Sequence, residues 1–238
     1  MLAKVNGIEL YYEVLGEGEP LILVHGNSED HTIFDTASET LSKNFTCYLL
    51  DSRGHGNSTK TNNLDYRTMA EDIYAFINEL KLEGCSYYGL ADGGIIGLIA
   101  ASKYPDLFKN LIISGVNTNP KGIKPWTYYA FKIFNFFHPT ARFRMLLEQP
   151  NITDEELKKI KCKTFVLAGN HDLVLEEHIK HIAEQIPNAT LKIIDGEGLG
   201  SYVVHRDKIA HLITEFLRPD LVPPQTIEEN NNQQKSSS

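Results

Sequence analysis

The sequence predicts an α/β protein with a mostly parallel sheet that helices cover on both faces. Continuous apolar runs such as PLILV and FTCYLL recur along the chain, and such runs are typical of strands buried on both sides. Segments with apolar residues at helical spacing lie between them. The 238 residues, 42% of them hydrophobic, suffice to bury the core of one large domain.

The elements follow one another in a regular order. Two alternating runs joined at Asn6-Gly7 predict an antiparallel hairpin at the start of the chain. Further strands are expected at PLILVHG, FTCYLLD, CSYYGL, FKNLIISG, KTFVLAGNHD and ATLKIID. Helices are expected at 32–42, 66–82, after the turn that follows CSYYGL, at EEHIKHIAEQI and at 207–217. This alternation indicates a mostly parallel sheet.

One segment, residues 117–161, breaks the alternation. It is aromatic, helical and interrupted by prolines, and Thr153 with Glu156 predicts a capping box. We expect a small helical lid because its aromatic residues are too dense for a solvated surface; additional core helix is the alternative. The folded domain then spans 1–217, and the polar, repetitive residues 218–238 are expected to be a disordered tail.

Composition excludes several classes of partner. A net charge of −8, without a block of basic residues, argues against binding of nucleic acid. Cys47, Cys85 and Cys162 lie in or beside apolar runs and match no metal-site spacing, so we expect reduced core thiols. There is no signal-peptide pattern and no apolar run of membrane-spanning length. We therefore predict a cytoplasmic protein with no membrane span, no metal and no cofactor.

The stretch GLADGGIIG, residues 89–97, has the form of a catalytic turn. A strand, a tight glycine-bounded turn and a helix are the setting of the nucleophile elbow G-x-S-x-G. Gly89 and Gly93 occupy the glycine positions, but Ala91 stands where the nucleophile belongs. We expect position 91 to have a strained, positive φ, which costs alanine about 1 kcal/mol or more without any catalytic return.

Six stretches in the same order resemble the α/β-hydrolase superfamily, and within it the small esterase-like alpha/beta fold hydrolases. They are LILVHGNSEDHTIFD, LLDSRGHGNS, YYGLADGGIIGL, KYPDLFKNLIISG, LAGNHDLV and GEGLGSYVVH, and the resemblance as a whole runs over residues 5–217. The resemblance implies the α/β-hydrolase fold. It also implies acyl transfer by a nucleophile, an acid and a base in that chain order, with two N–H donors for the oxyanion.

The resemblance assigns these roles to positions in this chain. It implies that the backbone N–H groups of Asn27 and Asp92 are the oxyanion donors and that Asp172 is the acid. The family's usual text G-x-G-H-G-S has its base where this chain has Leu199. Two of the three triad positions, Ala91 and Leu199, therefore carry apolar residues. We predict a protein that is inactive or nearly so.

Other residues offer weaker routes to catalysis. Asp92 could be an aspartate nucleophile only if the elbow shifted by one residue, which places Leu90 where the turn needs a small residue. His205 lies six residues past the base position and is interpreted as structural. Ser28 follows Asn27 without an evident base and is interpreted as a surface loop residue. We expect His25 to be a buried residue that orients its loop and does not take part in catalysis.

Two functional hypotheses follow. The first is a parent carboxylic ester hydrolase that lost its triad by natural decay or by deliberate mutation. The alternative is a non-catalytic pseudoenzyme that binds a small apolar or acyl ligand under the lid. Oxygenase-like or lyase-like chemistry is disfavoured because it still relies on a histidine base. Trp126 and Tyr129 are expected to contact the ligand, among the aromatic lid residues Trp126, Tyr128, Tyr129, Phe131, Phe134, Phe136 and Phe137.

Overall fold

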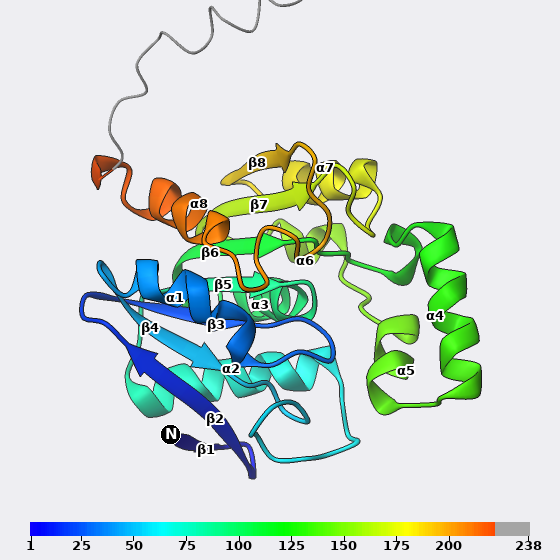
Figure 1. Cartoon of the computed structure of the whole chain (residues 1–238), viewed down its shortest axis with the longest axis horizontal. Coiled ribbons are helices and arrows are strands. Elements are labelled where there is room, and N and C mark those ends of the chain that lie inside the picture. The colour runs from blue at the N-terminus through cyan, green and yellow to red at the C-terminus, as the bar shows by residue number, and fades with distance from the viewer. Residues whose placement is uncertain (222–238) are drawn as a thin grey trace, which may run out of the picture.

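The computed structural model describes residues 1–221, which build an eight-stranded sheet between two layers of helices (Figure 1). The strand order across the sheet is β1-β2-β4-β3-β5-β6-β7-β8. β1 and β2 form the antiparallel hairpin predicted at Asn6-Gly7, and β2 is also antiparallel to β4. All other neighbours are parallel, so the predicted fold class is confirmed. The strands are β1 (Leu2–Val5), β2 (Ile8–Leu15), β3 (Glu19–Val24), β4 (Phe45–Leu50), β5 (Cys85–Leu90), β6 (Phe108–Ser114), β7 (Lys163–Gly169) and β8 (Ala189–Ile194).

Helices cover the sheet on both faces. α1 and α8 lie on one face, and α2, α3 and α7 lie on the other (Figure 1). α1 directly follows the short 3₁₀ turn η1, so the helix expected over 32–42 is split in two. These elements are η1 (His31–Phe34), α1 (Asp35–Leu41), α2 (Tyr66–Leu80), α3 (Asp92–Lys103), α7 (Glu176–Gln185) and α8 (Lys208–Leu217).

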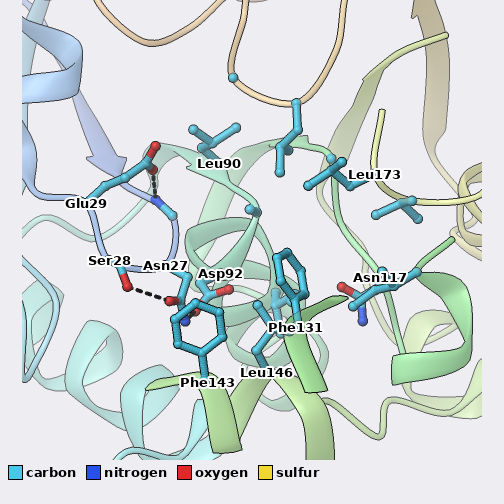
Figure 2. Close-up of a pocket in the computed structure, with 18 of the residues that line it drawn as sticks. Asn27, Ser28, Glu29, Leu90, Asp92, Asn117, Phe131, Phe143, Leu146 and Leu173 are labelled. Carbon is cyan, nitrogen blue, oxygen red and sulfur yellow. Dashed lines mark hydrogen bonds between the residues drawn. The ribbon is translucent and has the colours of Figure 1, made fainter. Parts of the chain in front are cut away.

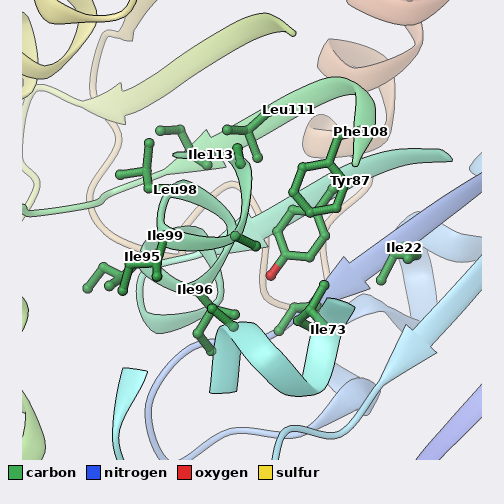
Figure 3. Packing of buried hydrophobic residues seen from close by; sticks show 14 of the residues in the cluster. Ile22, Ile73, Tyr87, Ile95, Ile96, Leu98, Ile99, Phe108, Leu111 and Ile113 are labelled. Carbon is green, nitrogen blue, oxygen red and sulfur yellow. The ribbon is translucent and has the colours of Figure 1, made fainter. Parts of the chain in front are cut away.

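The central strands are buried on both faces, which explains their continuous apolar runs. Along β6, Leu111 and Ile113 pack against α2 and α3, whereas Ile112 faces the opposite layer. On β5, Tyr87 lies against α3 in the core between the sheet and helices α2, α3 and α7 (Figure 3). Its hydroxyl donates a hydrogen bond to Gly93 O over 2.6 Å. Alternate side chains therefore enter two separate cores, as period-two geometry requires.

The segment 117–161 forms four short elements beyond the carboxyl ends of the parallel strands (Figure 1). The capping box predicted at Thr153 and Glu156 is present. The expected burial of its aromatic residues is wrong, because Thr127 is the one buried residue of α4. Within residues 1–221, α4 contacts α5 on one side, and most of its large apolar side chains on the other side are exposed. The four elements are η2 (Pro120–Gly122), α4 (Pro125–Phe137), α5 (Ala141–Glu148) and α6 (Asp154–Leu157).

The final described residues continue past α8. The 3₁₀ turn η3 (Pro219–Leu221) follows the helix, and Arg218 pairs with Asp220 at 2.8 Å. The expectation of disorder from residue 218 onward therefore does not hold for these first residues, and the rest of the predicted tail lies outside the described residues. No helix in the described range 1–221 has the length and apolar character needed to cross a bilayer.

Candidate active site

The tight turn between β5 and α3 holds its apex residue in a strained conformation. Ala91 has φ 45° and ψ −109°, and its backbone N–H donates to Ser114 O over 2.8 Å. A Cβ on Gly89 would lie 2.3 Å from the carbonyl carbon of Gly93, and a Cβ on Gly93 would lie 2.3 Å from Val24 O. The positive φ predicted at position 91 is therefore confirmed, with a methyl group at the apex.

The loop after β3 faces this apex. A Cβ on Gly26 would lie 3.4 Å from the Cβ of Ala91, which is van der Waals distance. The N–H of Gly26 donates to Glu29 Oε2 over 2.9 Å and holds the loop in place. Within residues 1–221, the backbone N–H groups of Asn27 and Asp92 donate to no other group, and both residues line the same cavity. Their role as oxyanion donors stays a prediction.

Asp92 is the first residue of α3 and its side chain is buried beside the elbow. Asn27 Nδ2 donates to Asp92 Oδ2 over 2.9 Å, and Ser28 Oγ donates to Asn27 Oδ1 over 2.8 Å (Figure 2). Burial raises the pKa of Asp92 to about 6, against the opposing effect of hydrogen bonds from Asn27 and Tyr66. Because Ala91 forms the apex, the elbow lacks the one-residue shift that an aspartate nucleophile needs.

Asp172 is buried after β7, and one of its oxygens lacks a partner. Its Oδ1 accepts from the N–H of Val174 over 3.3 Å, whereas Oδ2 has no hydrogen bond to any described residue. A Cβ on Gly115 would lie 2.3 Å from Leu199 Cδ1 and 3.1 Å from Asp172 Oδ2. Burial raises the pKa of Asp172. The structure thus brings the predicted acid and base positions together, with the alkyl side chain of Leu199 at the predicted base position.

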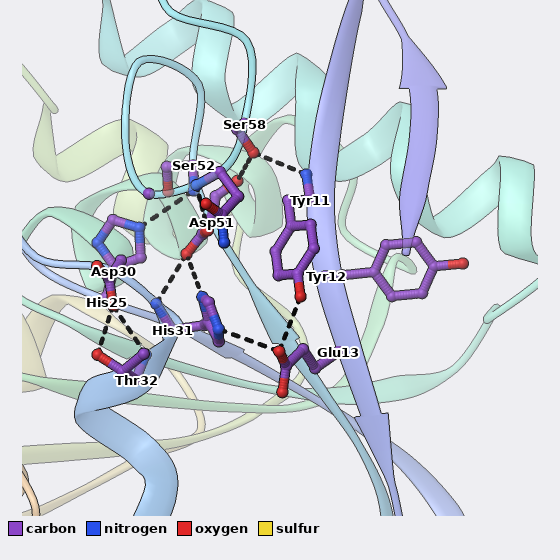
Figure 4. A network of polar contacts seen from close by, with 12 residues as sticks. Tyr11, Tyr12, Glu13, His25, Asp30, His31, Thr32, Asp51, Ser52 and Ser58 are labelled. Carbon is purple, nitrogen blue, oxygen red and sulfur yellow. Dashed lines mark hydrogen bonds and ion pairs between the residues drawn. The ribbon is translucent and has the colours of Figure 1, made fainter.

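Two buried histidines lie behind the loop after β3. His25 Nε2 accepts from the N–H of Ser52 over 3.1 Å, so its Nδ1 carries the proton and donates to Gly26 O over 2.7 Å (Figure 4). His55 Nδ1 donates to Arg53 O over 2.9 Å. Burial lowers the pKa of His25, and it lowers that of His55 to about 4. Both rings are neutral, and His25 orients its loop as expected.

The remaining candidates for replacement catalysis make other contacts. His205 is exposed, and its Nδ1 lies 2.9 Å from Asp35 Oδ1 at the start of α1. It does not line the cavity at the elbow. Ser28 does line this cavity, at φ 61°, but its hydroxyl proton goes to Asn27 rather than to a base. These contacts agree with the structural roles expected for both residues.

A cavity of about 260 Å³ lies between the elbow and helices α4 and α5, which together form a roof over it (Figure 2). Phe131 from α4 and Phe143 and Leu146 from α5 close it opposite Ala91. The wall is mostly apolar, as is typical of sites for small organic ligands. The polar side chains on the wall are those of Asn27, Ser28, Glu29, Tyr66, Asp92, Asn117 and Gln149.

Trp126 and Tyr129 do not line this cavity. They lie on the opposite side of α4 and are 65% and 60% exposed. Phe131 is on the inner side because it shares a helical face with the buried Thr127, four residues earlier.

Several lining residues were missed in the sequence. Phe143 and Leu146 come from α5, three residues apart on one helical face, and Asn117 follows β6. Glu29 lines the wall as well, although the sequence of its run, Ser28-Glu29-Asp30, suggests only ordinary helix caps. Phe143 contacts Phe131 with ring centroids 5.8 Å apart. No sequence motif marks these positions, because whether they line the cavity depends on how α4 and α5 pack over the elbow.

Asp30, His31 and Asp51 form a compact cluster near the site, with potential ligand atoms within 4.8 Å of one another. Asp51 Oδ1 accepts from both the backbone N–H and Nδ1 of His31 over 2.8 Å (Figure 4). Asp30 Oδ1 accepts from the N–H of Thr32 over 3.0 Å and begins η1. Protein donors thus already engage these oxygens, so the cluster is explained as a scaffold for the loop.

Comparison with known proteins identifies the class to which this fold and site belong. The family model for the alpha/beta hydrolase fold matches residues 19–144, more than half of the chain. The chain therefore belongs to the alpha/beta hydrolase family, and the resemblance found in the sequence is confirmed.

Individual relatives are distant but cover most of the chain. The serine hydrolase BPHL of Mus musculus is 26% identical, over 90% of this chain and 84% of that protein. The AB hydrolase superfamily protein YisY of Bacillus subtilis (strain 168) is 25% identical, over 88% and 95%. A thermophilic esterase from Thermogutta terrifontis superposes with a TM-score of 0.77 over 92% of this chain and 98% of that one, at 22% identity. This last likeness shows the shared fold.

Proposed function

We propose that this chain is an esterase-type α/β hydrolase that does not catalyse ester hydrolysis with its present residues. The observation that supports this is the pairing of Ala91 at the elbow apex with Leu199 beside the predicted acid. Ala91 has no oxygen for attack, and Leu199 can neither accept nor deliver a proton. The unpartnered Oδ2 of Asp172 is what the loss of an imidazole partner leaves behind.

The groups that remain fit acyl transfer. A hydroxyl at position 91 would project from the apex of the elbow into the cavity. The backbone N–H groups of Asn27 and Asp92 would then stabilise the negative charge that develops on the carbonyl oxygen, helped by the amino end of α3. Asp172 would orient an imidazole at position 199 and stabilise its protonated form. Residues 117–161 would act as the lid.

The test is restoration of the two missing groups. We expect the Ala91→Ser, Leu199→His double variant to hydrolyse p-nitrophenyl butyrate at least about 10³-fold faster than the unchanged chain. Either single variant should stay near the unchanged chain, because nucleophile and base act as a unit. Adding Asp172→Asn to the double variant should remove most of the gain, since the imidazole then loses its orienting carboxylate.

Fast turnover by the unchanged chain would overturn the proposal and move the search for a nucleophile to Asp92 or Ser28. Failure of the double variant to gain activity while it keeps the thermal stability of the parent would contradict the assignment of Leu199 as the base position. Circular dichroism melts of each variant separate this outcome from misfolding.

The second candidate is a binding function of the same cavity, for a small apolar or acyl ligand. It is favoured by the mostly apolar wall and by the strained elbow, which persists although no nucleophile needs it. Ligand binding to the folded state raises its stability by mass action. A short carboxylic acid such as butyrate or phenylacetate should therefore raise the melting temperature, by about 2 °C or more at saturating concentration.

A matched pair of variants locates this binding. Leu146 lines the cavity, whereas its neighbour Leu147 lies outside it. Leu146→Trp should fill the cavity and abolish the ligand-dependent shift, and Leu147→Trp should keep it. Equal shifts in both variants would place binding elsewhere on the protein.

A reducing, cytoplasmic environment is part of the proposal. Cys47, Cys85 and Cys162 are buried and unpaired. Burial raises the pKa of Cys47 and of Cys85 to about 12, which keeps both thiols protonated and unreactive. Titration with a thiol reagent should detect three thiols after unfolding and few before it.

A further inference from the structure

The outer side of α4 carries a continuous stripe of exposed apolar side chains. Trp126, Tyr129, Ile133, Phe136 and Phe137 are 65%, 60%, 61%, 79% and 69% exposed. Their spacing of three, four, three and one residues keeps them on one helical face. We call these five residues the α4 stripe. Five large apolar side chains side by side are far more than a monomer normally leaves in water.

The stripe is not the face that holds α4 in place. The inner face packs on α5, where the ring of Phe143 lies 5.8 Å from that of Phe131 and 4.9 Å from that of Phe134. Thr127 is buried on this inner side. α4 stands at the edge of the molecule, beyond the carboxyl ends of the parallel strands (Figure 1). Among residues 1–221 nothing covers its outer apolar face, as the exposure of the five stripe residues shows.

The charge of this segment is opposite to that of the protein. All 31 acidic residues lie outside 107–147, although the net charge of the chain is −8. Lys132 lies on α4 four residues before Phe136, Lys121 shares a groove with Tyr129, and Arg144 is exposed on α5. Within the described range these three cations form no ion pair, because the salt bridges there use other cations. The α4 stripe therefore lies in a net positive segment, and we call these three cations its rim, although Glu148 lines the same groove as Tyr129.

We propose that the α4 stripe docks the protein on the surface of an anionic phospholipid bilayer. Tryptophan, tyrosine and phenylalanine side chains insert at the boundary between headgroups and acyl chains, and flanking lysine and arginine bind anionic headgroups. The helix lies in the plane of the surface and does not cross it. A second copy fits this face less well, since a two-fold contact would bring the same cations of both copies together.

The chain carries its own reporter, because Trp126 is its single tryptophan and lies in the stripe. We expect its emission to shift to the blue with vesicles containing roughly one-third phosphatidylglycerol in phosphatidylcholine, and far less with phosphatidylcholine alone. Brominated acyl chains should quench the emission. About 0.5 M NaCl should weaken binding, since it screens the charges at the rim.

Paired variants in co-sedimentation with the same vesicles test the two parts of the proposal. Lys132→Glu, Arg144→Glu should lower the partition coefficient about tenfold or more. The matched control Lys4→Glu, Lys43→Glu, on β1 and after α1, makes the same change in net charge and should alter binding by less than about twofold. Phe136→Ser, Phe137→Ser should lower it at least about tenfold, because both side chains lose their place in the interface.

Three results would overturn the proposal. One is the absence of both the blue shift and co-sedimentation with anionic vesicles. Another is equal weakening by the control pair and the rim pair. The third is a stable dimer of the unchanged chain in sedimentation equilibrium together with a monomeric Phe136→Ser, Phe137→Ser variant, since the stripe would then be a contact between copies. Docking needs no reaction in the cavity, so these results are independent of the proposed esterase ancestry.

Discussion

The floor of the candidate active site and the roof above it are held by different forces. The floor consists of loops after β3, β4 and β5, and a network of hydrogen bonds joins most of its buried polar groups, His55 Nε2 being without a partner among residues 1–221. Asp51 is fully buried and accepts from His31 and from the N–H of Asn57 (Figure 4). The roof is made of α4 and α5, which meet through aromatic rings, and the buried hydroxyl of Thr127 has no partner among residues 1–221.

This difference explains why the turn between β5 and α3 keeps its shape with alanine at its apex. The turn depends on backbone approaches between glycines and on the loop network, and not on any side-chain atom beyond Cβ at position 91. The floor is thus determined by many contacts that do not involve the side chain at position 91. The roof has few hydrogen bonds of this kind. Its outer surface can therefore take part in binding without disturbing the turn.

The largest expected effect is the loss of the central carboxylate of the floor. Asp51→Ala leaves three donors without an acceptor, two of them on the buried His31, and should lower the free energy of unfolding by about 3–5 kcal/mol. Glu19→Ala, which removes an exposed ion pair with Lys109, is the matched control and should cost less than about 1 kcal/mol. Chemical denaturation of both variants measures the difference. Equal losses would show that the floor does not depend on this network.

The next effect is stabilising and depends on pH. The pKa of Asp92 is raised from its ordinary value of 3.8 to about 6, so the folded state keeps a proton that the unfolded state releases. Ionisation of Asp92 therefore lowers the free energy of unfolding. This loss is absent below about pH 4, grows up to about pH 6 and stays constant above it. Asp92→Asn should therefore raise stability by about 2 kcal/mol at neutral pH and leave it nearly unchanged in acid. Melts over this pH range test the sign.

A smaller effect separates strained from regular backbone. Ala91→Gly should stabilise the fold by about 1 kcal/mol, because glycine accepts positive φ without steric cost. Ala130→Gly, at an exposed position inside α4, should destabilise it by about 1 kcal/mol, because glycine lowers helix propensity there. Opposite signs in denaturant titrations would confirm that strain is stored in the floor and not in the roof. The same sign in both would contradict it.

The smallest effect concerns the outer side of the roof. Phe136→Ala should change the free energy of unfolding by less than about 0.5 kcal/mol, since its ring is 79% exposed. Phe76→Ala removes a ring that is fully buried in α2 and should cost about 3–5 kcal/mol. A cost above about 2 kcal/mol for Phe136→Ala would mean that the ring packs on the folded chain in solution.

Much of the floor was predictable because its signals are local. The glycine spacing around Ala91 predicted a strained turn, and the apolar run before it predicted a buried strand; both are present. The capping box at Thr153 and Glu156 was equally local. In each case the interacting residues are neighbours in the chain, so their conformation follows from their own chemistry.

The roof was predicted less well because its burial depends on distant partners. The density of aromatic residues in α4 suggested a buried helix, but density does not say which face has a neighbour. Phe131 faces α5 and the cavity, while Trp126 and Tyr129 face outward. A helix that is apolar on every side provides no periodic signal for its inner face.

The sequence by itself determined the order of strands and helices, the turn at position 91 and the apolar residues at positions 91 and 199, since each depends on residue type and spacing. Only the tertiary structure decided that Leu199 lies beside Asp172, that burial raises the pKa of Asp92 and that the α4 stripe faces outward. These properties arise where segments far apart in the chain come together. Burial and electrostatic environment are set there, and no local pattern encodes them.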